Sequence, residues 1–455
     1  WLDAAGYADS EGKRSQDPLR PNSYKYRDYV VRAFNNDKPY DRFLLEQLAG
    51  DELFDVENAQ TVTPEMVDSL VATGFLRMAP DGTGSDVVNR VPERLEVIAD
   101  EIDIFSTTVL GLSMKCARCH SHKYDPIPQR DYYRLAAVFK GAFDEHDRLK
   151  PAVVPGQSKV AKPGRVLSIA TPEELAEMEA NNRKVDQQIE VERQRLADLA
   201  EQLKADRDLD SKEVQNEPEY KNMKGEVDRL IKALESQRQT EPQIRALWDR
   251  GEPSPTYIYR RGDYLQPSRL VGPGVPSVLT DGKTPFDVQP PLTGAQKTGS
   301  SLALARWLVQ PDHPLTSRVL VNRIWQHHFG RGIVASVGNF GELGTPPTHP
   351  DLLDWLARQF VARGWSIKEM HRLIMQSTAY RQSSQTSEEM LEADPHNELV
   401  SRMPLRRIGA EELNDALLVV SGRLTPQMFG RPDPVNVRPD GLVTPRQVDG
   451  GWRRS

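Results

Sequence analysis

Long apolar runs, a strong charge of one sign and familiar catalytic motifs are all missing from this sequence of 455 residues. No stretch approaches the roughly 18–20 consecutive apolar residues of a membrane-spanning helix, so we expect no membrane span. The 66 acidic and 59 basic side chains give a net charge of −7, which argues against a nucleic-acid partner. Phosphate-binding loops, dinucleotide fingerprints, GxSxG and HExxH are also absent, so these motifs leave open whether the chain is an enzyme.

Cysteine is almost absent as well, and this scarcity is informative. The only two cysteines fall in Cys116-Ala-Arg-Cys-His120. C-x-x-C-H is the attachment signature of c-type haem, and composition alone would produce it in on the order of one such chain in ten thousand. Two thiols three residues apart can form thioethers with the haem vinyl groups while the adjacent histidine ligates the iron. We therefore predict covalent haem c bound by Cys116, Cys119 and His120.

Three other interpretations of the motif stay open. Structural zinc could be bound by Cys116, Cys119, His120 and His122, although such ligands usually come from two separate knuckles. A redox-active dithiol is the second, although the expected βαβ context is missing. The third is a pair of buried, inert cysteines.

The sixth iron ligand is not indicated by the sequence. No methionine lies between Cys119 and Met178, and His122 is too close in sequence to reach the opposite haem face. The remaining candidates are Met78, His146, His327 and His328. An empty position is equally compatible with the sequence, and it would favour chemistry at the iron over electron relay.

Apolar spacing predicts a mainly α, multidomain fold. The predicted regions are a helical cytochrome-like domain over residues 1–160, a coiled-coil hairpin over 161–250, a Pro/Gly-rich extended connector over 251–299, and a helical domain over 300–455. In the first region a long helix is predicted from Pro92 to about Met114. The connector contains a strand candidate, 256–260, followed by an Arg261-Gly-Asp263 turn.

The hairpin prediction rests on capping and on heptads. Thr171-Pro-Glu-Glu174 has the composition of a capping box with proline at the first helical position. Apolar residues then recur at a and d positions, first up to Leu203 and again from Tyr220 to Leu234, with Asn182 and Glu192 as polar exceptions. The pattern predicts two antiparallel helices that form a structural arm or a docking element for a partner.

Several motifs resemble a known pair of domains. The matching segments of the first half are 7–10, 26–30, 39–43, 46–51, Cys116–His120 and Lys123-Tyr-Asp-Pro126, and those of the second half are 321–325, 327–330, Asn339-Phe-Gly341, 347–350, 354–357 and 377–383. The first set resembles the planctomycete cytochrome-like PSCyt2 domain (DUF1549). The second resembles its usual companion, the PSD1 domain (DUF1553). The chain begins inside the first domain and ends inside the second, so we expect it to be truncated at both ends.

The resemblance implies an extracytoplasmic protein, either periplasmic or secreted. It also suggests, by association, an oxidative step in polysaccharide or sugar breakdown, with a redox protein or glycan-active enzymes as partners. The alternative is a non-redox scaffold or glycan-binding protein in which the cysteines hold a disulfide or zinc. Arg323 and His327 lie four residues apart on one predicted helix, next to His328. This group could bind an anionic sugar, ligate a metal or reach the haem, or it could simply be a helix end with a satisfied core histidine.

Overall fold

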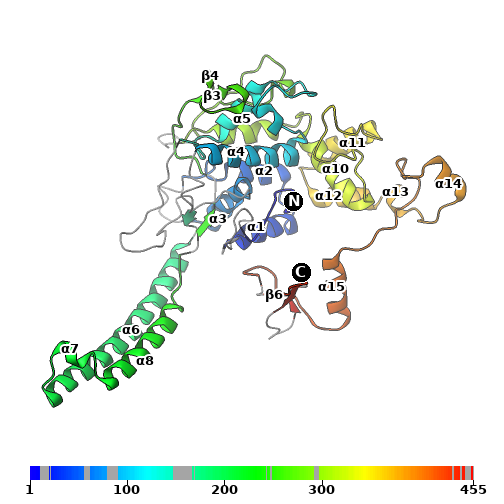
Figure 1. Cartoon of the computed structure of the whole chain (residues 1–455). Helices are drawn as coiled ribbons and strands as arrows, with labels where there is room; N and C mark the ends of the chain where they lie inside the picture. Colours follow the sequence, from blue (N-terminus) through cyan, green and yellow to red (C-terminus); the bar gives the residue numbers. More distant parts are fainter. Residues whose placement is uncertain are drawn as a thin grey trace. The chain divides into compact units, whose positions relative to one another are not determined.

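A computed structural model of the chain describes residues 1–10, 20, 22–55, 62–78, 91–146, 166–168, 170–241, 243–245, 248–291, 297–432, 435–440, 443–445 and 452–453. In these residues helices dominate and strands occur in two-stranded pairs. The predicted mainly α fold is therefore confirmed (Figure 1). The chain divides into two compact units, one formed by residues 1–58, 68–167 and 244–455 and the other by 59–67 and 168–243. No helix in the described ranges is long and apolar enough to cross a bilayer.

Short helices make up the amino-terminal part of the first unit. They are α1 (Tyr24–Asn35), α2 (Tyr40–Ala49), α3 (Pro64–Ala72), η1 (Thr73–Arg77), α4 (Val91–Phe105), η3 (Ser106–Leu110), η4 (Lys115–Arg118) and α5 (Gln129–Phe139). Pro39 and Pro128 stand directly before α2 and α5. Each proline is the N-cap residue of the helix that follows, a position where its missing N–H removes no intrahelical hydrogen bond.

The helix predicted over residues 92–114 is shorter in the structure. α4 ends at Phe105 and continues as the π-helical turn η3, which stops at Gly111 with a φ of +60°. The Gly111 carbonyl accepts a 2.7 Å hydrogen bond from the N–H of Phe340. A Cβ at Gly111 would lie 2.8 Å from the Phe340 ring. The helix therefore ends where a distant segment packs against it, which the local apolar pattern could not indicate.

The second unit contains the predicted hairpin. It comprises α6 (Pro172–Arg207), the short α7 (Ser211–Val214) and α8 (Pro218–Glu235), with α6 and α8 side by side in Figure 1. The capping box is confirmed, since the Thr171 hydroxyl accepts from the N–H of Glu174 and the Glu174 carboxylate accepts from the N–H of Thr171. The helices are antiparallel, because Arg207 at the end of α6 pairs with Glu219 at the start of α8, 3.0 Å away.

Asn182, the polar exception at an a position, marks the other end of this pairing. Its side chain donates to the carbonyl of Gln239 and accepts from the N–H of the same residue, both at 3.0 Å. Asn182 thus fixes the chain just beyond α8 through main-chain atoms. The buried apolar residues of the hairpin include Val185, Ile189 and Val227.

The connector and the carboxyl-terminal part complete the first unit. The connector holds the antiparallel strands β3 (Thr256–Tyr259) and β4 (Pro267–Val271), with the turns η5 (Arg260–Gly262) and η6 (Ser277–Leu279). The helices that follow are α9 (Ser300–Leu308), α10 (Thr316–Phe329), α11 (Pro350–Ala362), α12 (Ile367–Met375), α13 (Thr378–Arg381), α14 (Glu388–Ala393) and α15 (Ala410–Val420). The remaining strand pairs are β1 (Val166–Ser168) with β2 (Gln243–Arg245), β5 (Leu424–Thr425) with β8 (Trp452–Arg453), and β6 (Val435–Val437) with β7 (Val443–Pro445).

Early and late segments of the chain share one core. Tyr40 at the start of α2 is 1% exposed, and its N–H donates to the carbonyl of Trp365 at 3.1 Å. Its ring centroid lies 6.0 Å from that of Phe360 and 6.5 Å from that of Trp365. α2 also packs against α9. The first unit is therefore built from both ends of the sequence.

Three buried carboxyl groups meet where α2 ends. Asp51 accepts a 2.7 Å hydrogen bond from the N–H of Asp249, and Glu52 accepts a 2.8 Å bond from the N–H of Leu302 in α9. Burial, together with the charge of Asp51, raises the pKa of Glu52 to about 9. Glu52 is thus protonated at neutral pH and can donate to the Asp249 side chain, which lies within hydrogen-bonding distance.

We expect Glu52→Gln to raise the melting temperature at pH 8–9 and to change it little near pH 5. The folded state raises the pKa of Glu52 from 4.5 to about 9. The protonated Glu52 side chain therefore stabilises the fold fully below pH 4.5, its pKa in the unfolded chain. This stabilisation is lost progressively as the pH rises from there to about 9. Glutamine keeps an acceptor for Leu302 and a donor for Asp249 but cannot ionise. Thermal unfolding between pH 5 and 9 measures the effect, with the exposed Glu411→Gln as control, and a pH-independent difference would contradict it.

We also expect the hairpin to be dispensable for the stability of the first unit. A short Gly/Ser linker in place of residues 170–241 joins the ends of β1 and β2, which are paired strands. Each doubling of the loop length changes the free energy of closing the loop by only about 0.6 kcal/mol. The shortened protein should unfold cooperatively at nearly the temperature of the full chain in calorimetry. Precipitation, or loss of the cooperative transition, would show that the hairpin stabilises the rest.

Candidate functional site

Cys116 lies in the 3-10 helix η4, and Cys119 is the capping residue directly after it, so both cysteines belong to one tight turn. Both thiols are exposed, and they are not joined in a disulfide. Ala117, between them, is completely buried. The middle of the turn is therefore anchored in the core while both sulfur atoms remain open to reaction with an external group.

His120 follows the turn and is also exposed. Its Nδ1 atom lies 2.7 Å from the carbonyl oxygen of Ser121. Because a carbonyl oxygen can only accept, Nδ1 carries the proton of the neutral ring and Nε2 keeps its lone pair. Metal-ligating histidines are commonly oriented in this way, with the second ring nitrogen donating to a backbone carbonyl. Nε2 of His120 thus has the protonation state of a metal ligand.

The backbone of the turn is held by hydrogen bonds to side chains of α5, one of which also bonds β3. The Arg118 carbonyl accepts hydrogen bonds from the Tyr133 hydroxyl and from the Gln129 side-chain amide, both at 2.9 Å. The same amide nitrogen of Gln129 donates to the carbonyl of Tyr259, also at 2.9 Å. The position of the cysteine turn therefore depends on the position of β3, more than 130 residues later in the chain.

Two ion pairs fix the flanks of the turn to α4. Lys115 lies 2.6 Å from Asp100, and Arg118 lies 2.7 Å from Glu96, one helical turn earlier. The hydrogen bond with Asp100 raises the pKa of the Lys115 ammonium. Both basic side chains are thus paired with carboxylates of α4.

The turn after β3 lies directly against Cys119. Arg261 and Gly262 both have left-handed backbone conformations, with φ of +53° and +75°. A Cβ at Gly262 would lie only 2.8 Å from the Cys119 sulfur. Sequence reasoning identified this Arg-Gly-Asp turn but not its position beside the cysteine motif.

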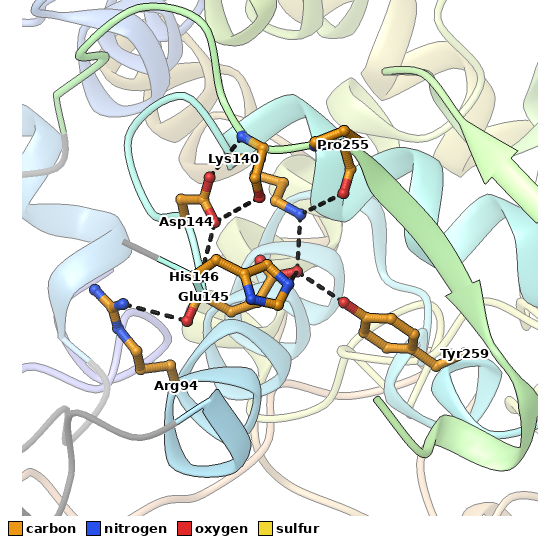
Figure 2. Close-up of polar contacts among 8 residues, drawn as sticks. Arg94, Lys140, Asp144, Glu145, His146, Pro255 and Tyr259 are labelled. Atoms are coloured by element: carbon orange, nitrogen blue, oxygen red, sulfur yellow. Dashed lines mark hydrogen bonds and ion pairs between the residues drawn. The ribbon is translucent and has the colours of Figure 1, made fainter. Parts of the chain in front are cut away.

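A buried polar network holds β3 in place. Figure 2 shows Lys140 and Tyr259 both directed at the Glu145 carboxylate, at 2.8 and 3.0 Å. Lys140 also donates to the carbonyl of Pro255, immediately before β3, at 3.1 Å. Burial, followed by the Glu145 charge, raises the pKa of Tyr259 well above its usual range, so its hydroxyl stays a donor. His146, a candidate iron ligand, lies in this network, 3.6 Å from Glu145.

Asp144 secures the segment before β3. Its carboxylate accepts from the N–H and the hydroxyl of Ser254 at 2.7 and 2.8 Å. It also accepts from the N–H of His146 at 2.8 Å (Figure 2). These bonds together outweigh the desolvation of Asp144, so the pKa of its carboxyl is lowered although burial alone would raise it.

His122 points into the protein. Its Nδ1 accepts a 2.9 Å hydrogen bond from the N–H of Asp125, and its Nε2 lies 3.4 Å from the Ser113 hydroxyl. Asp125 in turn accepts a 2.7 Å bond from the N–H of Glu342. A Cβ at Gly341 would lie 2.5 Å from the Asp125 carboxylate. The Lys123–Pro126 and Asn339–Gly341 motifs, one from each resembled domain, are thus in contact.

The contacts of the other candidate residues involve neither the two cysteines nor His120. His328 Nε2 is 2.8 Å from His371 Nδ1, a partner that sequence reasoning missed, and burial lowers the pKa of His328 to about 4. Arg323 donates to the Thr107 carbonyl at 3.0 Å. Burial also lowers the pKa of His327. The Met78 side chain is buried, 6% exposed.

The donor atoms of the turn suit haem c better than zinc. Across the described parts of the chain, no three His, Cys, Asp or Glu side chains are arranged to hold a metal ion. A zinc site would need four converging ligands. In haem c the two sulfurs bond to carbon, and the motif itself supplies only one ligand to the iron. The two exposed thiols and the free Nε2 of His120 therefore fit this group.

Two family models match the chain. Residues 1–143 match PSCyt2, a protein of unknown function (DUF1549), and residues 300–455 match PSD1, also a protein of unknown function (DUF1553). The resemblance predicted from the motifs is confirmed, including the order of the two domains. Comparison with curated proteins and with solved structures gave no match.

We expect Gly262→Ala to disturb Cys119 specifically. A left-handed alanine costs roughly 1–2 kcal/mol, and its Cβ would displace the sulfur. Gly364 has a similar φ of +71° with nothing within 4 Å, so Gly364→Ala carries the backbone cost alone. Both variants should melt earlier than the wild type, but only Gly262→Ala should change the rate at which a thiol reagent modifies Cys119. Equal thiol kinetics in the two variants would contradict this packing role.

Proposed function

We propose that this chain, in which a PSCyt2 domain is followed by a PSD1 domain, is an extracytoplasmic protein that carries haem c and takes part in electron transfer. Cys116 and Cys119 would form the thioether bonds, and Nε2 of His120 would be the axial ligand. One observation carries the proposal. The hydrogen bond from His120 Nδ1 to the Ser121 carbonyl leaves Nε2 free beside two exposed thiols.

The haem supplies one-electron oxidation and reduction at its iron when bound. The chain would position the two sulfurs and the imidazole that bind it. The turn from Lys115 to Arg118 sets the separation of the sulfurs, and the Arg118 carbonyl ties that turn to Tyr133 and Gln129. The Ser121 carbonyl orients the imidazole and makes Nε2 a stronger donor, since the acceptor draws on the Nδ1 proton.

The opposite face of the iron defines two versions of the proposal. A sixth ligand from Met78, His146, His327 or His328 would make the protein an electron relay. An open position would allow chemistry at the iron. The extracytoplasmic location follows from haem attachment and from the family resemblance. The resemblance also supports a role in oxidative breakdown of polysaccharides or sugars alongside glycan-active enzymes.

Expression with a haem-attachment system tests the proposal. The purified protein should gain the mass of one haem and give the pyridine haemochrome spectrum of haem c, whereas Cys116→Ala/Cys119→Ala should be colourless. His120→Ala should retain covalent haem but shift the Soret and visible bands, because the thioethers come from the cysteines and the axial field from the imidazole.

His349→Ala is the matched control, because the His349 ring contacts the Thr348 hydroxyl at 3.0 Å and lies outside the motif. Its spectrum should equal that of the wild type. A colourless wild-type protein with two titratable thiols would overturn the proposal. Zinc found by metal analysis, or a disulfide, would then favour the non-redox scaffold or glycan-binding protein.

A further inference from the structure

A cleft of about 860 Å³ lies between α5, α9 and the loop that follows η6. Its volume is within the range of small-molecule sites. Basic and aromatic side chains form much of its wall. They are Arg130, Arg134, Arg306, Trp307, Phe286 and His313.

Two of the arginines are available to a ligand. Neither the Arg134 nor the Arg306 guanidinium makes a hydrogen bond or an ion pair with any residue that the structure describes. Arg134 is half-buried and held in place, because its guanidinium lies so close to Gly274 that a Cβ there would be 2.3 Å from it. Arg306, on α9, is exposed. Two guanidinium groups that share a cleft without a carboxylate partner are suited to an external anion.

Two of the three acidic residues of the same wall use their oxygens locally, and the third, Asp312, is exposed beside His313. Asp281 accepts from the N–H groups of Lys283 and Thr284, at 2.9 and 2.8 Å, and from the Thr284 hydroxyl at 2.7 Å. Asp287 accepts from the Gln289 side chain at 2.9 Å. The groups left without partners in the cleft are therefore mainly donors, and these require acceptors on the ligand.

His313 is buried behind the cleft and supports an aromatic wall. Its Nδ1 accepts from the N–H of Thr316 at 3.1 Å, so the neutral ring carries its proton on Nε2. Nε2 is buried and has no hydrogen-bond partner in the described part of the chain. The His313 ring meets the Trp307 ring edge to face, with centroids 4.4 Å apart. Trp307 is thus fixed at the cleft, where a half-buried indole can pack on a ring.

We propose that this cleft binds an oxyanion carried on a sugar-sized ring, either a carboxylate or a sulfate ester. Arg134 and Arg306 bind the charged group, and Trp307 packs against the ring. The shared chemistry is a planar or tetrahedral oxyanion that accepts several charge-assisted hydrogen bonds, which guanidinium groups donate in pairs. The cleft is separate from the cysteine turn, so binding does not depend on haem.

Titration calorimetry at low salt tests this site with D-glucuronate and glucose 6-sulfate as the two probes and D-glucose as the neutral control. At least one probe should bind in the millimolar range or tighter, and glucose should not. Arg306→Gln should weaken binding about tenfold, since the lost charge-assisted bond corresponds to roughly that factor. Arg358→Gln, a change of an exposed arginine on α11 outside the cleft, should leave the affinity unchanged.

The relative affinities of the probes identify the charged group, a carboxylate if glucuronate binds more tightly and a sulfate ester if the sulfate does. Trp307→Leu, checked for folding by its melting temperature, should also weaken binding of the preferred probe. The proposal is overturned if neither probe binds the wild type, if glucose binds as well as the anions, or if Arg306→Gln binds as the wild type does. Because each result is obtained equally with and without attached haem, it stands independently of the redox proposal.

Discussion

Buried carboxyl groups that accept main-chain N–H groups hold this protein together. Five such bonds, each 2.7–2.8 Å long, join early acidic residues to segments 110–250 residues later: Asp51 to Asp249, Glu52 to Leu302, Asp125 to Glu342, Asp131 to Ser277, and Asp144 to Ser254. A hydrogen bond to a charged group contributes about 1.5–3 kcal/mol and one to a neutral group, such as the protonated Glu52, about 0.5–1.5 kcal/mol, while a buried carboxylate without a partner is costly. Each of these five late segments is therefore attached to an acidic residue of the first 150.

These attachments explain why two family models describe parts of one compact unit. The Asp125 carboxylate accepts from the N–H of Glu342, while the N–H of Asp125 donates to His122, two residues after His120 of the cysteine motif. Asp144 and the Lys140–Glu145 pair place β3, whose last residue, Tyr259, shares Gln129 with the cysteine turn. The surroundings of Cys116 and Cys119 are thus assembled from the PSCyt2 region and from the connector. The PSD1 region is attached nearby, through the bond between Asp125 and Glu342. We expect neither region to form this site alone.

The sequence predicted the elements that have strong local signals. The features that it did not predict share one physical cause. Heptads and the Thr171 capping box depend on residue type at fixed spacing, and both the hairpin and the cap are confirmed. The carboxyl–backbone bonds carry no such signal on the donating side, because every residue except proline offers an N–H. From the sequence alone, Glu52, Asp125 and Asp144 therefore cannot be distinguished from ordinary acidic residues of the surface. For the same reason, neither the end of η3 at Gly111 nor the pairing of His328 with His371 could be anticipated, since both depend on segments far away in the chain.

The cysteine turn is fixed by its backbone, and this has a consequence for its chemistry. Ala117 is buried and the Arg118 carbonyl is bonded twice, whereas the side chains of Cys116, Cys119 and His120 are exposed. The folding of the turn therefore does not use the groups that would react, and a bulky addition to the sulfurs leaves the core packing intact. Space is limited on the side of the turn where Gly262 lies against Cys119 in a left-handed conformation. A glycine there leaves room for the sulfur, whereas any side chain would press on it, so the connector determines which face of the turn an attached group can occupy.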